Sequence, residues 1–150
     1  MEVRKLTEEE SPPIELLLTA DPSENLVKEY LKKGFCYIAE EKDQVIGVYV
    51  LLPTKEESIE LVNLAVAEIY QGKGLGKKLV MHAVEEARKL GYKEMDVGTG
   101  NSSIGQLALY QKCGFRITHI EKDFFLKNYK EEIYENEIQC VDMIRLSQDI

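Results

Sequence analysis

The sequence has little cysteine and no long apolar run. Its three cysteines, Cys36, Cys113 and Cys140, are odd in number and lack metal-ligand spacing, so neither a disulfide framework nor a bound metal is expected. The longest apolar run, residues 45–52, is far shorter than the roughly 18 residues that a membrane-spanning helix needs. The first ten residues lack the apolar segment of a secretory signal. We therefore expect a cytoplasmic protein that does not enter a membrane.

Basic residues are also scarce. Nineteen lysines and arginines stand against 27 acidic residues, which gives a net charge of −8. Proteins that bind nucleic acid draw much of their affinity from basic side chains that neutralise phosphates, so this balance argues against such a partner. An acidic surface suits a cationic small molecule, but it also serves solubility alone, and both interpretations stay open.

The hydrophobic pattern predicts one domain over residues 1–150. Strands are expected at residues 1–6, 35–40, 44–52, 59–66, 92–98, 115–120 and 137–146, and helices at 14–19, 22–33, 75–90 and 103–113, with a loop over most of 123–136. Asp21 is predicted as the N-cap of the second helix, with Pro22 in its first position and Glu24 at N3. This order of elements predicts an α/β (α+β) fold, in which a mixed sheet is flanked by helices in three layers.

A glycine-rich turn follows the strand at 59–66 and opens the long helix. Its residues are Gln71, Gly72, Lys73, Gly74, Leu75, Gly76 and Lys77. The first N–H groups of a helix have no acceptor within it, and the helix dipole favours an anion there, so a pyrophosphate is the natural ligand. A helix start with flexible glycines and no ligand is the alternative interpretation.

Two other phosphate-binding motifs do not fit this turn. A P-loop requires glycine where Gln71 stands and serine or threonine where Lys78 stands. A dinucleotide-binding fingerprint that begins at Gly72 requires a third glycine where Lys77 stands, and it normally opens a domain.

The turn belongs to a larger pattern. The motif Gln71-x-x-Gly74-x-Gly76, preceded by Leu64-Ala65-Val66 on a strand, resembles the acetyl-CoA signature of the GCN5-related N-acetyltransferase (GNAT) superfamily. A second block of that family is similar to Asn101, Ala108, Tyr110 and Gly114-Phe115. The two blocks span residues 58–115. The resemblance implies a mixed, mostly antiparallel central sheet of about seven strands flanked by about four helices.

The resemblance also implies an acyltransferase that uses acetyl-CoA, with no metal. In this family the acetyl-CoA lies where two strands part, here those at 59–66 and 92–98. Backbone groups of Leu64, Ala65 and Val66 are then expected to pair with the pantetheine amides. The turn from Gln71 to Lys77 is expected to hold the pyrophosphate, and Asn101 to hydrogen-bond the pantetheine arm.

Two side chains are implied in the chemistry. Tyr110 matches the family's general acid, which contacts the cofactor and protonates the departing thiolate; a packed helix aromatic is the alternative. Glu60 stands six residues before Val66, where several family members have a catalytic carboxylate. The alternative is a solvent-facing Glu60, with water as the base. A backbone N–H near Val66 is expected to polarise the thioester carbonyl.

The resemblance implies an acceptor site formed by the first two helices and the connection between the last two strands. This connection is rich in aromatic and acidic residues: Phe124, Phe125, Tyr129, Tyr134, Glu121, Asp123, Glu131, Glu132 and Glu135. Rings beside carboxylates suit a cationic amine with an apolar body. A surface loop anchored by its aromatics is the alternative.

We therefore expect acetylation of a small amine, such as an aminoglycoside, a polyamine, an amino acid or another metabolite. A protein N-terminal or lysine acetyltransferase and a non-catalytic acyl-CoA-binding regulatory module are the alternatives. Family members are often dimers, frequently through terminal strands. The apolar alternation at 137–146 is compatible with a homodimer of this kind.

Overall fold

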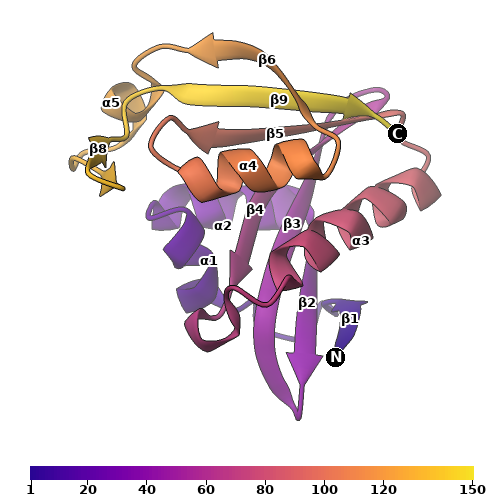
Figure 1. Ribbon diagram of the computed structural model, residues 1–150. Coiled ribbons are helices and arrows are strands. Elements are labelled where there is room, and N and C mark those ends of the chain that lie inside the picture. The colour runs from indigo at the N-terminus through magenta and orange to yellow at the C-terminus, as the bar shows by residue number, and fades with distance from the viewer.

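A seven-stranded sheet of order β1-β2-β3-β4-β5-β9-β6 runs through the computed structural model, which describes residues 1–150 (Figure 1). Its strands are β1 (Glu2–Lys5), β2 (Phe35–Glu41), β3 (Gln44–Lys55), β4 (Ser58–Val66), β5 (Glu94–Gly100), β6 (Arg116–Glu121) and β9 (Met143–Asp149). Every neighbouring pair is antiparallel except β4 and β5, which are parallel. The mixed, mostly antiparallel sheet expected from the sequence is confirmed.

Helices cover both faces of this sheet. They are α1 (Ile14–Ala20), α2 (Glu24–Lys33), α3 (Leu75–Lys89), α4 (Ile104–Lys112) and the short α5 (Phe124–Asn128), with a single 3-10 turn, η1 (Glu68–Tyr70). The helices α3 and α4 lie on one face, and α1 and α2 lie on the other (Figure 1). The expected three layers are present, with one helix more than the four predicted.

The two faces of the sheet bury cores of unequal size. The larger core lies under α3 and α4 and includes Leu79, Ile59 and Val97. The smaller core lies under α1 and α2 and includes Leu17 and Val27. Side chains alternate along a strand, so each side chain of β4, β5 and β9 points either to the larger core or to the smaller one.

The start of α2 differs from the prediction. The helix begins at Glu24 with Ser23 as its N-cap, and the Ser23 hydroxyl accepts the N–H of Leu26 at 3.3 Å. Asp21, the predicted N-cap, instead accepts the N–H of Ser23 at 3.1 Å. Serine and aspartate are almost equivalent caps in sequence, so the local pattern could not choose between them.

The segment after β6 also differs from the prediction. The expected loop at 123–136 contains α5 and β7 (Tyr134–Glu135), and β7 pairs with β8 (Ile138–Gln139) in a separate two-stranded sheet. The last strand begins at Met143, because the side-chain oxygen of Asn101 accepts the N–H groups of Val141 and Asp142 just before it. Those two N–H groups are therefore withheld from a strand ladder.

The position of β9 corrects the expected dimer surface. This terminal strand lies between β5 and β6 and is paired on both sides, so its edges are not available to a second copy. The exposed edges of the sheet belong to β1 and β6.

The larger core gives a stability prediction. Leu79 on α3 is fully buried, and Leu79→Ala is expected to lower the free energy of unfolding by about 2–5 kcal/mol, through lost burial and the cavity left behind. Met81, two residues further along the same helix, is 45% exposed, and Met81→Ala is expected to change stability by less than about 0.5 kcal/mol. Urea unfolding of both variants measures these changes. Equal losses in the free energy of unfolding would contradict a core beneath Leu79.

Candidate active site

The strands β4 and β5 pair only at one end. Their register covers Ser58–Leu61 on β4 and Glu94–Val97 on β5, and beyond it β4 continues on β3 while β5 continues on β9. The parting begins at a bulge, because Val50 and Leu51 of β3 face Asn63 and Leu61 of β4, which leaves Val62 as an extra residue. A bulge bends its strand, so it turns β4 away from β5.

Backbone groups of β4 face the gap between these strands. The N–H of Ala67 bonds the carbonyl of Ile46 on β3 at 2.8 Å. Since the polar groups of successive strand residues alternate between the two edges, those of Val66 and Leu64 are directed to the opposite edge, toward the gap. A ligand with amide groups could pair with this edge like an added strand.

The glycine-rich turn lies at the end of β4 and starts α3. Gly72 and Gly74 have φ of 76° and 82°, in the left-handed region that glycine adopts without strain. The N–H groups of residues 72–77 have no acceptor in the chain. The side-chain amide of Gln71 donates to the carbonyl of Val66 at 2.9 Å, which fixes the turn against β4. This row of free donors at a helix start can hold a pyrophosphate.

The two lysines of the turn differ in surroundings. The Nζ atom of Lys73 lies 5.5 Å from the centre of the Tyr70 ring. Lys77 is close enough to Cys113 on the end of α4 that its charge lowers the pKa of this thiol, although burial raises that pKa more. Both lysines add positive charge where the turn has its free N–H groups.

Tyr110 lies on the inner side of α4. It is 4% exposed and belongs to the same core as Leu64 of β4. Its ring packs edge-on against Phe115 with 5.9 Å between ring centres, and its hydroxyl accepts the side-chain amide of Gln106 at 3.4 Å. Burial raises the pKa of Tyr110 above its ordinary value, so the hydroxyl keeps its proton and stays a donor.

Glu60 projects from β4 into a group of charged side chains. Its Oε2 atom lies 3.4 Å from Nη1 of Arg145 on β9, and Nε of Arg145 donates to Glu121 at 2.8 Å. Burial raises the pKa of Glu60; the Arg145 charge opposes this shift, while the charges of Asp96 and Glu121 add to it. The Glu60 side chain is 24% exposed, so it is largely withdrawn from solvent.

A glycine makes the contact between Glu60 and Arg145 possible. Gly98 is paired with Arg145 across β5 and β9. A Cβ atom at Gly98 would meet Nη1 of Arg145 at 2.8 Å and the sulfur of Met143 at 2.7 Å. The Arg145 side chain therefore crosses β5 at Gly98, which has no side chain of its own, and reaches Glu60 on β4.

Asn101 has a structural task that the sequence did not predict. Its amide donates to the carbonyl of Gln139 at 3.0 Å and accepts the N–H groups of Val141 and Asp142. These bonds use the side-chain oxygen and one amide hydrogen. Its expected contact with the pantetheine arm stays a prediction, which the remaining amide hydrogen could satisfy.

Only some of the aromatic residues in the connection between β6 and β9 pack together near Arg145. The Phe124 ring lies under the guanidinium of Arg145, 5.7 Å from its carbon, and Phe125 packs against Tyr129. The Tyr129 hydroxyl donates to Asp21 at 2.8 Å and so joins this connection to the segment between α1 and α2. Tyr134 is 59% exposed and lies outside the group.

Sequence reasoning missed the polar residues that join these segments. The Tyr30 hydroxyl donates to Asp21 at 3.3 Å, and the amide of Asn63 donates to that hydroxyl at 2.7 Å. Arg145 was missed as well. No short motif surrounds these residues, and they become visible only when strand order brings distant segments together.

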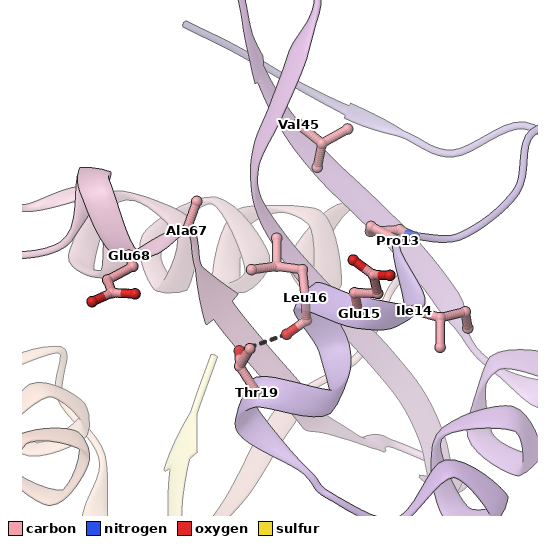
Figure 2. Close-up of a pocket in the computed structure, with 8 residues that line it drawn as sticks. All are labelled: Pro13, Ile14, Glu15, Leu16, Thr19, Val45, Ala67 and Glu68. Atoms are coloured by element: carbon pink, nitrogen blue, oxygen red, sulfur yellow. Dashed lines mark hydrogen bonds between the residues drawn. The ribbon is translucent and has the colours of Figure 1, made fainter.

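A cavity of about 560 Å³ opens between α1 and the end of β4. It is lined by Pro13, Ile14, Glu15, Leu16, Thr19, Val45, Ala67 and Glu68. Ala67 and Glu68 lie across the opening from Leu16 and Thr19 (Figure 2). None of the predicted site residues lines it, but Ala67 directly follows β4, so the cavity adjoins the site on the face of α1.

Two general features complete the description. The structure has no group of three or more histidine, cysteine, aspartate or glutamate side chains arranged to hold a metal ion. None of its helices combines the length and apolarity needed to cross a membrane.

Comparison with known proteins finds a family model and relatives that agree with one another. A family model described as the acetyltransferase (GNAT) family matches residues 2–115. The uncharacterized N-acetyltransferase YvbK of Bacillus subtilis (strain 168) is 57% identical over 136 residues, which cover 91% of this chain and 88% of that protein.

Two solved structures are similar over nearly the whole chain. The IAA acetyltransferase from Bacillus cereus ATCC 14579 is 53% identical with a TM-score of 0.96, and the match covers 99% of both chains. A GNAT family acetyltransferase from Elizabethkingia anophelis, whose crystal structure has acetyl-CoA bound, is 46% identical with a TM-score of 0.97. That match covers 99% of this chain and 97% of the other.

The turn gives a prediction for ligand affinity. In Gly74→Ala, a side chain at φ of 82° costs about 1–2 kcal/mol, and the N-terminal turn of α3 is expected to shift. Affinity for acetyl-CoA, measured by titration calorimetry, should fall about tenfold. Gly105→Ala on α4 is the matched control, because a Cβ atom there also meets nothing within 4 Å but its φ is not positive. Equal affinities for the two variants would contradict the role of the turn.

Proposed function

The chain is an enzyme of the acetyltransferase (GNAT) family, and we propose that it transfers the acetyl group of acetyl-CoA to a primary amine of a small molecule. The observation that carries the proposal is the gap where β4 and β5 part. It combines the backbone groups of Leu64 and the N–H of Val66, which have no partner in the chain, with the N–H groups of residues 72–77 at its end. This edge suits the pantetheine amides and the turn suits the pyrophosphate.

The proposed reaction is direct attack of the amine on the thioester in a ternary complex. The amine nitrogen forms a bond to the acetyl carbon, and the bond from that carbon to sulfur breaks. The Val66 N–H stabilises the charge on the carbonyl oxygen. The amine proton passes to Glu60 or to a water molecule, and Tyr110 donates a proton to the departing sulfur, whose thiol has a pKa of about 8.5.

The surroundings of the gap favour a small acceptor. The hydrogen bond from Tyr129 to Asp21 joins the connection between β6 and β9 to the segment between α1 and α2. These are the two segments expected to bound the acceptor site, and a bridge between them restricts a polypeptide more than a small amine. The cavity beside α1 offers space of about 560 Å³ for the body of such an amine.

Two broader proposals accompany this function. We propose that residues 1–150 act as one acetyltransferase domain, supported by solved relatives that match 99% of the chain. We also propose a reducing compartment such as the cytoplasm, supported by the free thiols of Cys36, Cys113 and Cys140.

The direct test is release of free thiol from acetyl-CoA in the presence of small amines and short peptides. Amine-dependent release is expected, and Tyr110→Phe is expected to lower kcat about 10²-fold or more while acetyl-CoA affinity is unchanged, because only the acid is lost. Faster release with peptides would favour a protein acetyltransferase. Acetyl-CoA binding without release on any acceptor would favour a binding module, and unchanged turnover in Tyr110→Phe would remove this residue from the mechanism.

The pH dependence of Glu60→Gln tests the base. The pKa of Glu60 lies above 4.5, so the carboxyl is protonated below that raised pKa and cannot accept the amine proton. The ratio of wild-type to variant kcat/KM should therefore fall toward 1 as pH drops through this pKa, since titration of the amine itself cancels in the ratio. We expect a ratio of about 10² at neutral pH, and its fall toward 1 at lower pH would support a base at Glu60.

The control for this profile is Asp96→Asn. The Asp96 charge raises the pKa of Glu60, so its removal should move the fall to lower pH without abolishing it. A wild-type to Glu60→Gln ratio that is constant with pH would assign the proton to water instead.

A further inference from the structure

Asn63 on β4 carries a buried oxygen with no hydrogen-bond partner. The residue is 4% exposed, and its Oδ1 atom contacts no donor. Its Nδ2 atom is fully used, because it donates to the carbonyl of Leu17 at 3.0 Å and to the Tyr30 hydroxyl at 2.7 Å. A buried acceptor without a donor costs free energy, so such an atom in a native protein calls for a ligand or a specific function.

The orientation of the Asn63 amide is fixed by its neighbours. The Leu17 carbonyl can only accept, which requires the nitrogen on that side. The Tyr30 hydroxyl donates its own hydrogen to Asp21, so it too can only accept from Asn63. The oxygen is therefore held away from both α1 and α2, and it cannot pair with them by rotation of the amide.

The bulge at Val62 places Asn63 on the same face as Glu60. Residues three apart on a regular strand point to opposite faces. The extra residue at Val62 shifts this alternation by one, so that Glu60 and Asn63 point to the same face. Asn63 contacts α1 and α2, which cover this face. Glu60 contacts Arg145, whose neighbour Leu146 belongs to the core under α3 and α4, so Arg145 and Glu60 also lie on the face of α1 and α2.

Two acceptors thus flank the start of the gap. Glu60 stands on the last stretch of β4 that pairs with β5, and Asn63 stands just beyond it. The next residue, Leu64, directs its backbone groups toward the gap in which the thioester is expected. A primary amine that attacks there has two N–H groups when neutral. One can reach Glu60 or its water, and the other needs a second acceptor.

We propose that Asn63 is a specificity-determining residue whose Oδ1 atom accepts an N–H of the acceptor nitrogen, and that it thereby selects primary amines over N-methylated ones. This proposal rests on the proposed acetyl transfer. A secondary amine has only one N–H, so after its proton is directed to the base it leaves the Asn63 oxygen unpaired. Loss of a partner for a buried polar group corresponds to a discrimination of about tenfold or more.

The test uses probes that need no knowledge of the natural acceptor. S-(carbamoylmethyl)-CoA places an amide nitrogen with two N–H groups two bonds beyond the methylene on the sulfur, close to the position of the acceptor nitrogen. S-(N-methylcarbamoylmethyl)-CoA replaces one of those two hydrogens with a methyl group. The affinities of both for the wild-type protein and for Asn63→Leu are measured by titration calorimetry, with CoA as the reference ligand.

The expected result is a difference in selectivity. Leucine has the same branched arrangement of heavy atoms as asparagine, so the steric cost of the extra methyl group is retained in the variant while the acceptor is lost. The preference of the wild type for the unmethylated probe over the N-methyl probe should exceed that of Asn63→Leu by about tenfold or more. Tyr30→Phe is the matched control: it keeps the Asn63 oxygen and the bond from the Asn63 amide to the Leu17 carbonyl, and it should keep the wild-type preference.

Several outcomes would overturn the proposal. Equal preferences in wild type and Asn63→Leu, with CoA bound by both, would exclude Asn63 while leaving acetyl transfer intact. Failure of the wild type to bind CoA would instead refute the proposed function. If Asn63→Leu does not fold, a crystal structure of the wild type with the unmethylated probe decides. An Oδ1 to nitrogen distance within about 3.2 Å is expected, and a water molecule on Oδ1 in place of the probe would refute the contact.

Discussion

The parting of β4 from β5 is the constraint on which the rest of the site depends. Two parallel strands that stayed paired would satisfy each other's backbone groups, and no edge would be left for a ligand. Here the ladder ends at Leu61 and Val97, one residue before the bulge at Val62. The polar groups of Leu64 and the N–H of Val66 are then available, inside the protein, to a molecule that can complete the sheet.

The same bulge also decides which side chains meet at the gap. It brings Glu60 and Asn63 to one face of β4, where the first reaches Arg145 on β9 and the second reaches Tyr30 on α2. Through Asp21, Tyr30 is linked to Tyr129 in the connection between β6 and β9. One irregularity in one strand thus organises contacts with three other segments, and Gly98 contributes by leaving room for the arginine.

Local patterns in the sequence were enough for most elements and for the glycine-rich turn. Periodicity of apolar residues located α3 and the strands on either side of it, and the glycine-rich turn precedes α3 as expected. The prediction failed where a distant side chain intervened. Asn101 captures the N–H groups of Val141 and Asp142, so the alternation at 137–142 does not continue into β9. The start of α2 was displaced because Asp21 is engaged by two tyrosines.

By itself the sequence determined the helices, the strands and the left-handed turn at Gly72 and Gly74, because these depend on forces between residues a few positions apart. Only the tertiary structure decided what surrounds Glu60 and Asn63. Arg145 is 85 residues from Glu60 in the chain, and the insertion of β9 between β5 and β6 brings it within reach. The burial that raises the pKa of Glu60 and leaves the Asn63 oxygen without a partner arises from packing between layers, which no local pattern encodes.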